Sequence, residues 1–349
     1  MSDEVEQLAI NTQNGHAWWS NQGRDSREVG HNGLMNRLDA QKKAGLLFHT
    51  AKEPIERKGK IVDGHFYTVR TDTDAVLGVV GKTYQPIQND MLFDVLEGVV
   101  AETEAVYESA GSLSGGRRVF ALAKLPQEYF VAPGDWLRTY FLIALGHDGS
   151  LPYIMAGTDV RVVCKNTENL ALRTAAKDAM SHWQSIKNTI NAKYAIERAK
   201  RMIGLISTTR NPFIEAAQAM VNAPMSAKYL ENYVQVLFPS QSDADGKQPR
   251  ANVERQREII RMGFEAPINN IGQQHTAWSA YQALTDFVDH GHSSRQSVDR
   301  QDWSWFGDGV KLRNTAFNWL MDYPVAGREL ELVPVMNKAM NDPWEQLSL

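Results

Sequence analysis

Cysteine and long apolar runs are nearly absent from this chain of 349 residues. Its one cysteine, Cys164, excludes an internal disulfide and any metal site built from several thiolates. Because Cys164 follows two valines, we interpret it as a small buried hydrophobe and not as a nucleophile. The sequence contains no run of about 18 apolar residues, so no membrane-spanning helix is predicted. The acidic N-terminal segment lacks the apolar stretch of a secretion signal, so we expect a cytoplasmic protein without a membrane partner.

The sequence also lacks the short motifs of common catalytic and nucleotide-binding sites. The glycines from Gly111 to Gly116 are not followed by the lysine and hydroxyl residue of a P-loop, and neither GxGxxG nor GxSxG occurs. We therefore expect that the protein has no cofactor and that it binds a partner without catalysing a reaction. With a net charge of −4 and a pI near 6.2, the chain as a whole does not attract polyanions. A nucleic-acid partner would need a local basic patch.

Alternating and β-branched residues predict antiparallel strands through the first half of the chain. Asp148-Gly149 is a turn signal between two such runs, since both residues tolerate a positive φ. A helix capped by Asn89 or Asp90 is predicted between the first and second hairpins, and a polar link is predicted after Leu125. The predicted strand pairs are 65–70 with 76–80, 106–110 with 118–125, and 140–145 with 151–155, followed by a strand at 158–164.

After the last predicted strand, apolar residues recur at helical spacing. Asn166 or Thr167 can cap a helix that continues without proline to about Ile206. In the next segment, Trp278, Tyr281, Leu284 and Val288 fall roughly along one helix face. The shorter predicted helices are 212–221, 227–238, 252–262, 276–289 and 311–321.

These patterns predict an α+β fold, with antiparallel β-hairpins packed on a long helix and followed by a helical C-terminal part. We divide the chain into an N-terminal arm (1–60), a strand-rich core that ends in the long basic helix (61–210) and a helical part (211–349). A flexible linker is predicted near 239–250 from its polar, Pro- and Gly-containing composition.

Several motifs occur in one order between about residues 60 and 320: DGHFYTVRTDTDAVLGVVGKTYQPIQN, AGSLSGGRRVFALAKLP, HDGS, TDVRVVCKNTENLAL, TAWSAYQALTDFVDH and WFGDGVK. Together they resemble the phage/plasmid-like protein family, a domain of unknown function carried by phages, prophages and plasmids. The Trp18-Trp19 pair, followed by Ser20, departs from that family's tryptophan–histidine start. The resemblance implies a mobile-element origin and the host cytoplasm. At the level of fold, hairpins followed by a long helix resemble single-strand annealing recombination proteins.

Basic residues gather where the long helix is predicted. Between Ala156 and Arg210, ten basic residues stand against four acidic ones, a net charge of +6 within a chain of −4. A cationic groove holds single strands with little reading of sequence. We therefore expect binding and annealing of single-stranded DNA, assembly into a ring or filament, and a phage exonuclease or host protein as a further partner. The expected DNA-binding residues are Arg117, Arg118, Arg161, Lys165, Lys187, Lys193, Lys200 and Arg201.

One alternative is an interaction protein that inhibits a host defence or replication factor. Such a protein would present aromatic residues to its partner. The tryptophans predicted to lie in loops are Trp18, Trp19, Trp303 and Trp305.

A second alternative is a metal-dependent hydrolase or nuclease. Carboxylate and imidazole ligands for a divalent ion occur together at Asp286, Asp289, His290 and His292. Asp286 and His290 share a helix face, but no HExxH-like motif completes the set. A histidine at a helix C-terminus is also favoured by the helix dipole alone, so we expect capping there and no metal.

Overall fold

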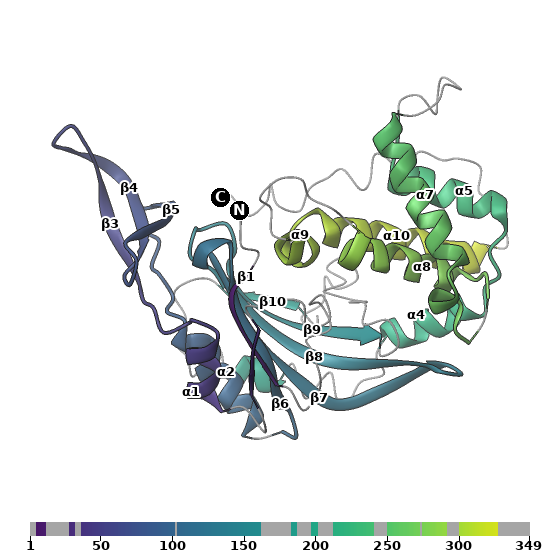
Figure 1. Cartoon of the computed structure of the whole chain (residues 1–349), viewed down its shortest axis with the longest axis horizontal. Helices are drawn as coiled ribbons and strands as arrows, with labels where there is room; N and C mark the ends of the chain where they lie inside the picture. The colour runs from purple at the N-terminus through teal and green to yellow at the C-terminus, as the bar shows by residue number, and fades with distance from the viewer. Residues whose placement is uncertain are drawn as a thin grey trace.

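The computed structural model shows an α+β protein, with two β-sheets in its N-terminal half and a helical C-terminal part (Figure 1). It describes residues 5–11, 28–31, 36–101, 103–161, 183–186, 197–201, 212–240, 250–272, 274–291 and 300–326. The strands are β1 (Val5–Asn11), β2 (Glu28–His31), β3 (Thr50–Arg57), β4 (Lys60–Arg70), β5 (Ala75–Gly81), β6 (Val106–Leu113), β7 (Arg118–Ala132), β8 (Asp135–Gly146), β9 (Tyr153–Arg161) and β10 (Trp183–Ile186). The helices are α1 (Arg37–Lys43), α2 (Asp90–Val100), α4 (Pro212–Val221), α5 (Ala227–Leu237), α7 (Ala251–Glu265), α8 (Ala277–Asp286), α9 (Arg300–Phe306) and α10 (Asp308–Ala326), with short turns η2 (Ser114–Gly116), η3 (Pro267–Asn270) and η4 (Phe287–Gly291).

The larger sheet has the strand order β10-β9-β8-β7-β6-β1-β2, and the smaller sheet has the order β3-β4-β5. Neighbouring strands are antiparallel except β1 and β2, which pair in parallel. All three predicted hairpins are confirmed, as β4–β5, β6–β7 and β8–β9. The prediction of separate strands at 151–155 and 158–164 is wrong, because Gly157 stays paired with Phe141 and β9 continues through it.

The β7–β8 hairpin is much longer than predicted. The link expected after Leu125 instead extends both strands, with a register shift between Lys124 and Glu128. The hairpin closes at Pro133-Gly134, where Gly134 has a φ of 79° that favours glycine. Its far end therefore reaches beyond the sheet towards the helical part (Figure 1).

The prediction of one unbroken helix from about Thr167 to Ile206 is wrong. Trp183 to Ile186 form β10, which pairs with β9 from Ala156 to Tyr153. Backbone groups on the open edge of β9 offer hydrogen bonds that helical spacing in the sequence does not reveal. Residues 197–201 are helical, as predicted.

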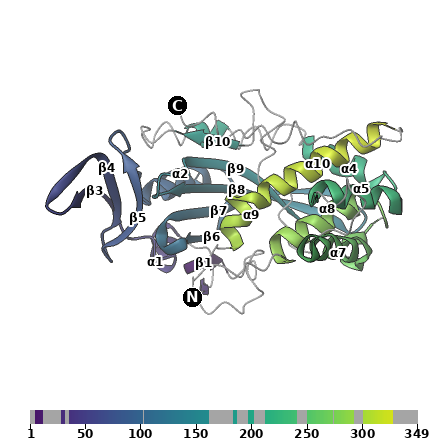
Figure 2. The ribbon, with the colours of Figure 1, turned by 90° about the horizontal axis from the view of Figure 1, so that it is seen from above.

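Each face of the larger sheet packs against a different helix. On one face, Phe141 lies in a buried cluster with Leu96 of α2. On the opposite face, Leu142 lies in a second cluster with Trp305 of α9. The view from above shows α9 crossing the strands (Figure 2). Burial of both aliphatic faces provides the main driving force for this arrangement.

The helical part has its own core, built on the far end of the β7–β8 hairpin. Trp278, Tyr281 and Leu284, the predicted apolar face of α8, are buried there together with Leu137 of β8. The helix is not amphipathic as predicted, since every residue from Ala277 to Thr285 is buried. Trp278 Nε1 donates a hydrogen bond of 2.8 Å to the buried carboxylate of Asp135, beside the hairpin turn. This bond ties the helices to the sheet. None of the described helices is both long enough and apolar enough to cross a bilayer.

Candidate nucleic-acid interface

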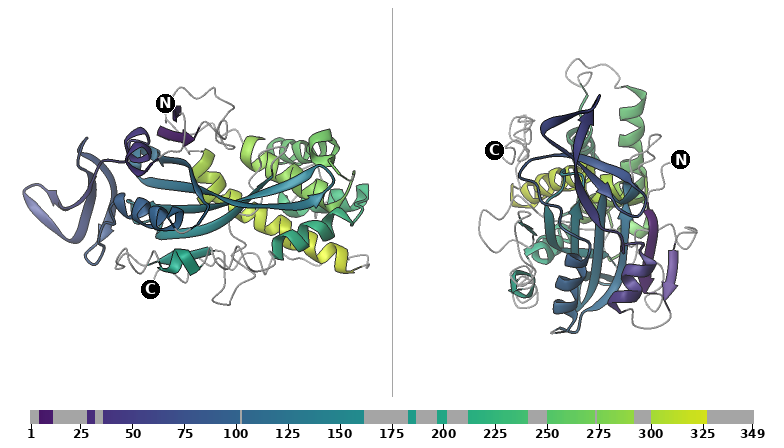
Figure 3. Two further views of the ribbon diagram at one scale, coloured as in Figure 1. Left: turned by 90° about the horizontal axis from the view of Figure 1, so that it is seen from below. Right: turned by 90° about the vertical axis from the view of Figure 1, so that its left-hand side faces the viewer.

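The smaller sheet forms an arm (β3, β4 and β5) that projects from the body of the protein (Figures 1 and 3). Its far end is a two-residue turn, Lys58-Gly59, with φ values of 51° and 73° between the paired residues Arg57 and Lys60. This is the geometry of a type I′ hairpin, which matches the twist of the strands. Thr68 is the first buried residue of β4. At a rise of 3.3 Å per residue, the turn stands about 25 Å beyond it.

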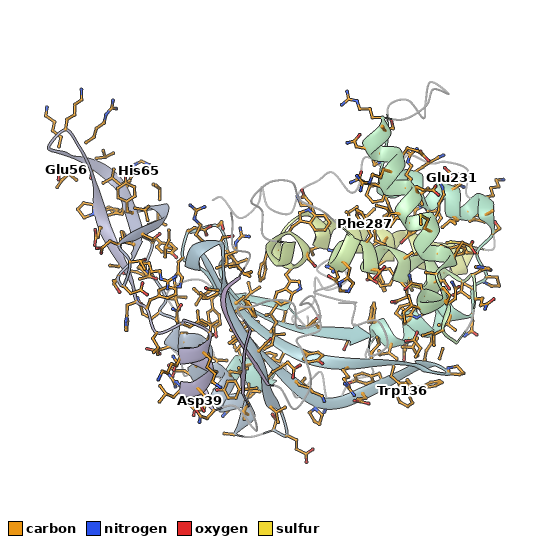
Figure 4. All side chains as sticks on the ribbon, viewed as in Figure 1. Asp39, Glu56, His65, Trp136, Glu231 and Phe287 are labelled. Carbon is orange, nitrogen blue, oxygen red and sulfur yellow. The ribbon has the colours of Figure 1, made fainter. Side chains whose placement is uncertain are left out.

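Three basic residues at this turn, Arg57, Lys58 and Lys60, are named here the tip cations. All three are exposed, and none forms an ion pair with another described residue. Residues 56–62 contain these three and one acidic residue, Glu56. Nitrogen-tipped side chains point away from the body beyond Glu56 (Figure 4). Their charges are solvated and form no ion pair with a described carboxylate, and they outnumber Glu56, so an approaching polyanion meets an attractive local potential in spite of the negative net charge of the chain.

The base of the arm packs on turns at the near end of the larger sheet. β5 crosses the β8–β9 turn so closely that a Cβ at Gly78 would lie 2.6 Å from Cα of Asp148. The guanidinium of Arg70 lies 4.1 Å from the ring centroid of Phe48 and pairs with Asp72 at 2.8 Å. These contacts set the direction in which the arm leaves the sheet.

A buried histidine lies at the same junction. His147 Nε2 is 2.8 Å from Asn89 Oδ1, and its Nδ1 is 3.2 Å from Thr50 Oγ1. Asn89 donates from Nδ2 to the carbonyls of Leu46 and Phe48, so its Oδ1 is the group that accepts from His147. His147 is therefore neutral, with the proton on Nε2, and it accepts from the hydroxyl of Thr50. Burial lowers its pKa from 6.5 to about 4, and nearby Asp148 offsets part of this shift.

Acid is expected to destabilise the protein through His147. The unfolded chain takes up a proton near pH 6.5, whereas the folded protein does so only near pH 4. Stability from this group is complete above pH 6.5 and falls towards pH 4, by about 3 kcal/mol. Urea denaturation at several pH values measures the loss. His147→Gln removes this titrating group, so the free energy of unfolding should vary less between pH 6.5 and about 4. The control His65→Gln, at an exposed position, should leave the pH dependence of the wild type in place.

Two predicted DNA-binding residues, Arg117 and Arg118, lie at the base of the arm in the β6–β7 turn. A Cβ at the neighbouring Gly116 would lie 3.2 Å from Nη1 of Arg70. The side chain of Arg117 is exposed, whereas Arg118 donates from Nη2 to Ser150 Oγ at 3.1 Å. Arg117 is therefore available to a polyanion that reaches the base of the arm.

Three other predicted DNA-binding residues are described and lie outside the arm. Arg161 is the last residue of β9, and Lys200 and Arg201 belong to the helical residues 197–201. Lys200 Nζ lies 3.5 Å from the carboxylate of Glu197, and the neighbouring Ala199 is buried in the α2 cluster. Three predicted residues lie outside the described part of the chain: Lys165, Lys187 and Lys193.

The tip cations were missed because β3 was not predicted. Pro54 and the charged residues around it are unfavourable in most strands. Proline is tolerated here because β3 is an edge strand of its sheet. A signal was present in the sequence, since Lys58-Gly59 between two basic residues has the composition of a tight turn.

The proposed metal cluster is divided by the fold. Asp289 is buried, pairs with Arg313 and accepts from Ser304 Oγ at 2.7 Å, so its carboxylate is already neutralised. Burial raises the pKa of Asp286, and His290 offsets part of the rise. No group of three His, Cys, Asp or Glu side chains suited to a metal ion occurs among the described residues, and His292 lies outside them.

The aromatic surface of the protein differs from the one expected. Trp305 is buried against the sheet and Trp303 is half-buried, while Trp18 and Trp19 lie outside the described residues. Two other aromatic side chains are exposed together near the end of the long hairpin. They are Phe130 and Trp136, 45% and 42% exposed, with ring centroids 5.2 Å apart.

Comparison with known proteins gives one family and no individual relative. A family model described as a domain of unknown function (DUF932) matches residues 76–305, from β5 to α9. The tip cations precede the matched segment. No curated protein and no solved structure matches the chain. Because the model covers more than half of the sequence, the chain belongs to the DUF932 family.

Proposed function

We propose that this protein binds single-stranded DNA and promotes the pairing of complementary strands, as a non-catalytic accessory of recombination or replication in a phage or other mobile element. The observation that carries the proposal is the arm tip, where three exposed cations, which have no ion partner among the described residues, stand at the end of a projecting ribbon. The DUF932 family has no assigned function, so the support comes from the arm and not from the family.

A phosphate backbone is the polyanion that such a tip suits best. Each Lys or Arg that neutralises a phosphate releases a condensed counterion, which favours binding without reading the base sequence. The tip cations give up no ion pairs among the described residues when they bind. Arg117 is exposed at the base of the arm, so a strand lying along the arm meets positive charge at both ends.

The preference for single strands and the assembly into a ring or filament rest on the likeness to annealing proteins that the sequence suggests. Both belong to the proposal and can be tested separately. Light scattering after size exclusion, with and without a single strand, measures the assembly state.

The direct test is fluorescence polarisation with the full-length protein. We expect a labelled single strand of about 40 nucleotides to bind with a log–log salt slope of at least about 2, since single strands release roughly 0.7 counterions per phosphate contact. A duplex of the same length should bind less tightly, and complementary strands should anneal faster with the protein present. Absence of binding in about 50 mM salt, where phosphate contacts are strong, would remove the proposal.

An interaction protein is the second candidate, because Phe130 and Trp136 expose two aromatic rings side by side. Exposed aromatic residues are enriched where proteins meet other proteins. On this proposal a host factor covers the pair. Trp136→Ala should then abolish capture of one specific host protein in a pull-down, while leaving DNA binding unchanged.

A further inference from the structure

Ile61 is the most exposed large apolar side chain among the described residues, at 70%, and it lies directly beside the tip cations. Single exposed aliphatic side chains are ordinary on protein surfaces. The position of Ile61 makes it informative. It is the residue after Lys60 in the projecting ribbon, and the next residue, Val62, is also 37% exposed.

The register of β3 and β4 places the paired basic residues and Ile61 on opposite faces of the tip. Arg57 pairs with Lys60, and Glu56 pairs with Ile61. Since successive side chains of a strand point to opposite faces, Arg57 and Lys60 share one face of the ribbon and Ile61 lies on the other. The tip is thus a thin blade with a cationic face, which carries Arg57 and Lys60, and an opposite face on which Ile61 lies beside Glu56.

We propose that the tip is a wedge for DNA forks, the junctions at which a duplex opens into two single strands. One diverging strand lies against the cationic face, while the terminal base pair of the duplex packs on Ile61. Aliphatic side chains insert at base steps in this way in other DNA-binding proteins, where they unstack neighbouring bases. The inference rests on the proposed function and names its substrate more narrowly, because a fork is the structure that forms while two strands are being paired.

The ribbon is thin enough for this role. A two-stranded β-ribbon fits the major groove of duplex DNA, which is about 12 Å wide, so the tip also fits between two diverging strands. The described part of the body does not obstruct it, since the arm projects from the end of the larger sheet (Figure 3).

An anionic membrane could also attract cations beside an aliphatic side chain, but the apolar area at the tip is too small for it. Membrane-surface segments bury a broad apolar face. Ile61 and Val62 are successive residues of β4 and lie on opposite faces of the ribbon, so neither face offers more than one of these two side chains.

The experiment compares a forked duplex with a single strand for the wild-type protein and for Ile61→Ala. The fork carries 2-aminopurine in its terminal base pair, which brightens when the base is unstacked. We expect the wild type to bind the fork roughly fivefold more tightly than the single strand and to brighten the probe. Ile61→Ala should lose both the preference and the brightening, while keeping the single-strand affinity and its salt slope. Ile61→Met keeps an apolar side chain and should retain both.

Leu38→Ala is the matched control, since Leu38 is an aliphatic residue of α1 that is 64% exposed far from the tip in sequence. It should behave as the wild type. Equal fork preference in the wild type and Ile61→Ala would overturn the wedge and leave single-strand binding intact. A wild type that binds no DNA removes the proposed function as well. A defect of Ile61→Ala in binding to phosphatidylserine vesicles, with fork binding unchanged, would overturn the wedge in favour of a membrane contact.

Discussion

Replacement of the three tip cations by alanine is expected to lower the affinity for a single strand of about 40 nucleotides by about 100-fold in about 50 mM salt. It should also reduce the slope of log affinity against log salt concentration by about 2. The change is Arg57→Ala, Lys58→Ala and Lys60→Ala in one protein. All three side chains are exposed and without ion pairs among the described residues, so the substitutions remove charge without removing packing. Fluorescence polarisation across a salt series measures both quantities, and thermal unfolding should be nearly unchanged.

Two control variants distinguish the effect of where the charges lie from the effect of the total charge. Lys42→Ala, Arg250→Ala and Arg255→Ala remove the same number of exposed positive charges from α1 and the start of α7, and should leave most of the affinity in place. Exchange of arginine and lysine at the three tip positions keeps the charge and should keep the salt slope. An equal loss in the tip and control proteins would show that net charge, and not the arm, attracts DNA.

Trp278→Ala is expected to lower the free energy of unfolding by about 4 kcal/mol, as for other buried large aromatic residues. The indole is 1% exposed, packs beside Phe213 and Tyr281, and donates to Asp135 across the boundary between helices and sheet. Trp278→Phe keeps much of the packing and removes the hydrogen bond to the carboxylate, at a cost of about 2 kcal/mol. Urea denaturation measures both losses.

Trp136→Ala is the control for the same residue type. Trp136 is 42% exposed, and its substitution should cost less than about 1 kcal/mol. If Trp278→Ala and Trp136→Ala were equally destabilising, the Trp278–Asp135 contact could not be what joins the helices to the hairpin.

Residues with a strong local signal were predicted well. The turn at Asp148-Gly149 is confirmed, with Gly149 at a φ of 80°. The helix that includes α8 is also confirmed, and Thr276 begins it with a capping box that includes Ser279. In both places the cause lies within a few residues, because turn and cap geometry depend on side chains next to the backbone they bond.

Residues whose structure depends on a distant partner were predicted poorly. Trp183 to Ile186 lie within a helical pattern but pair with β9, about 30 residues earlier in the chain. Pro54 makes the segment of β3 look unlike a strand, but β3 forms because it pairs along one edge with β4. Ladder hydrogen bonds of this kind outweigh local propensity, which spans only about 1 kcal/mol per residue.

The candidate site shows the same division. Residue patterns alone predicted an α+β chain, and the single cysteine excluded an internal disulfide. Arg117 was among the residues expected to bind DNA, which stays a prediction. The gathering of Arg57, Lys58 and Lys60 into a solvated tip required the arm, because a charge attracts a polyanion only if folding leaves it exposed and unpaired. Likewise Asp289 looked like a metal ligand until the fold placed Arg313 beside it. Burial and pairing are properties of the packed chain, and no local pattern of residues encodes them.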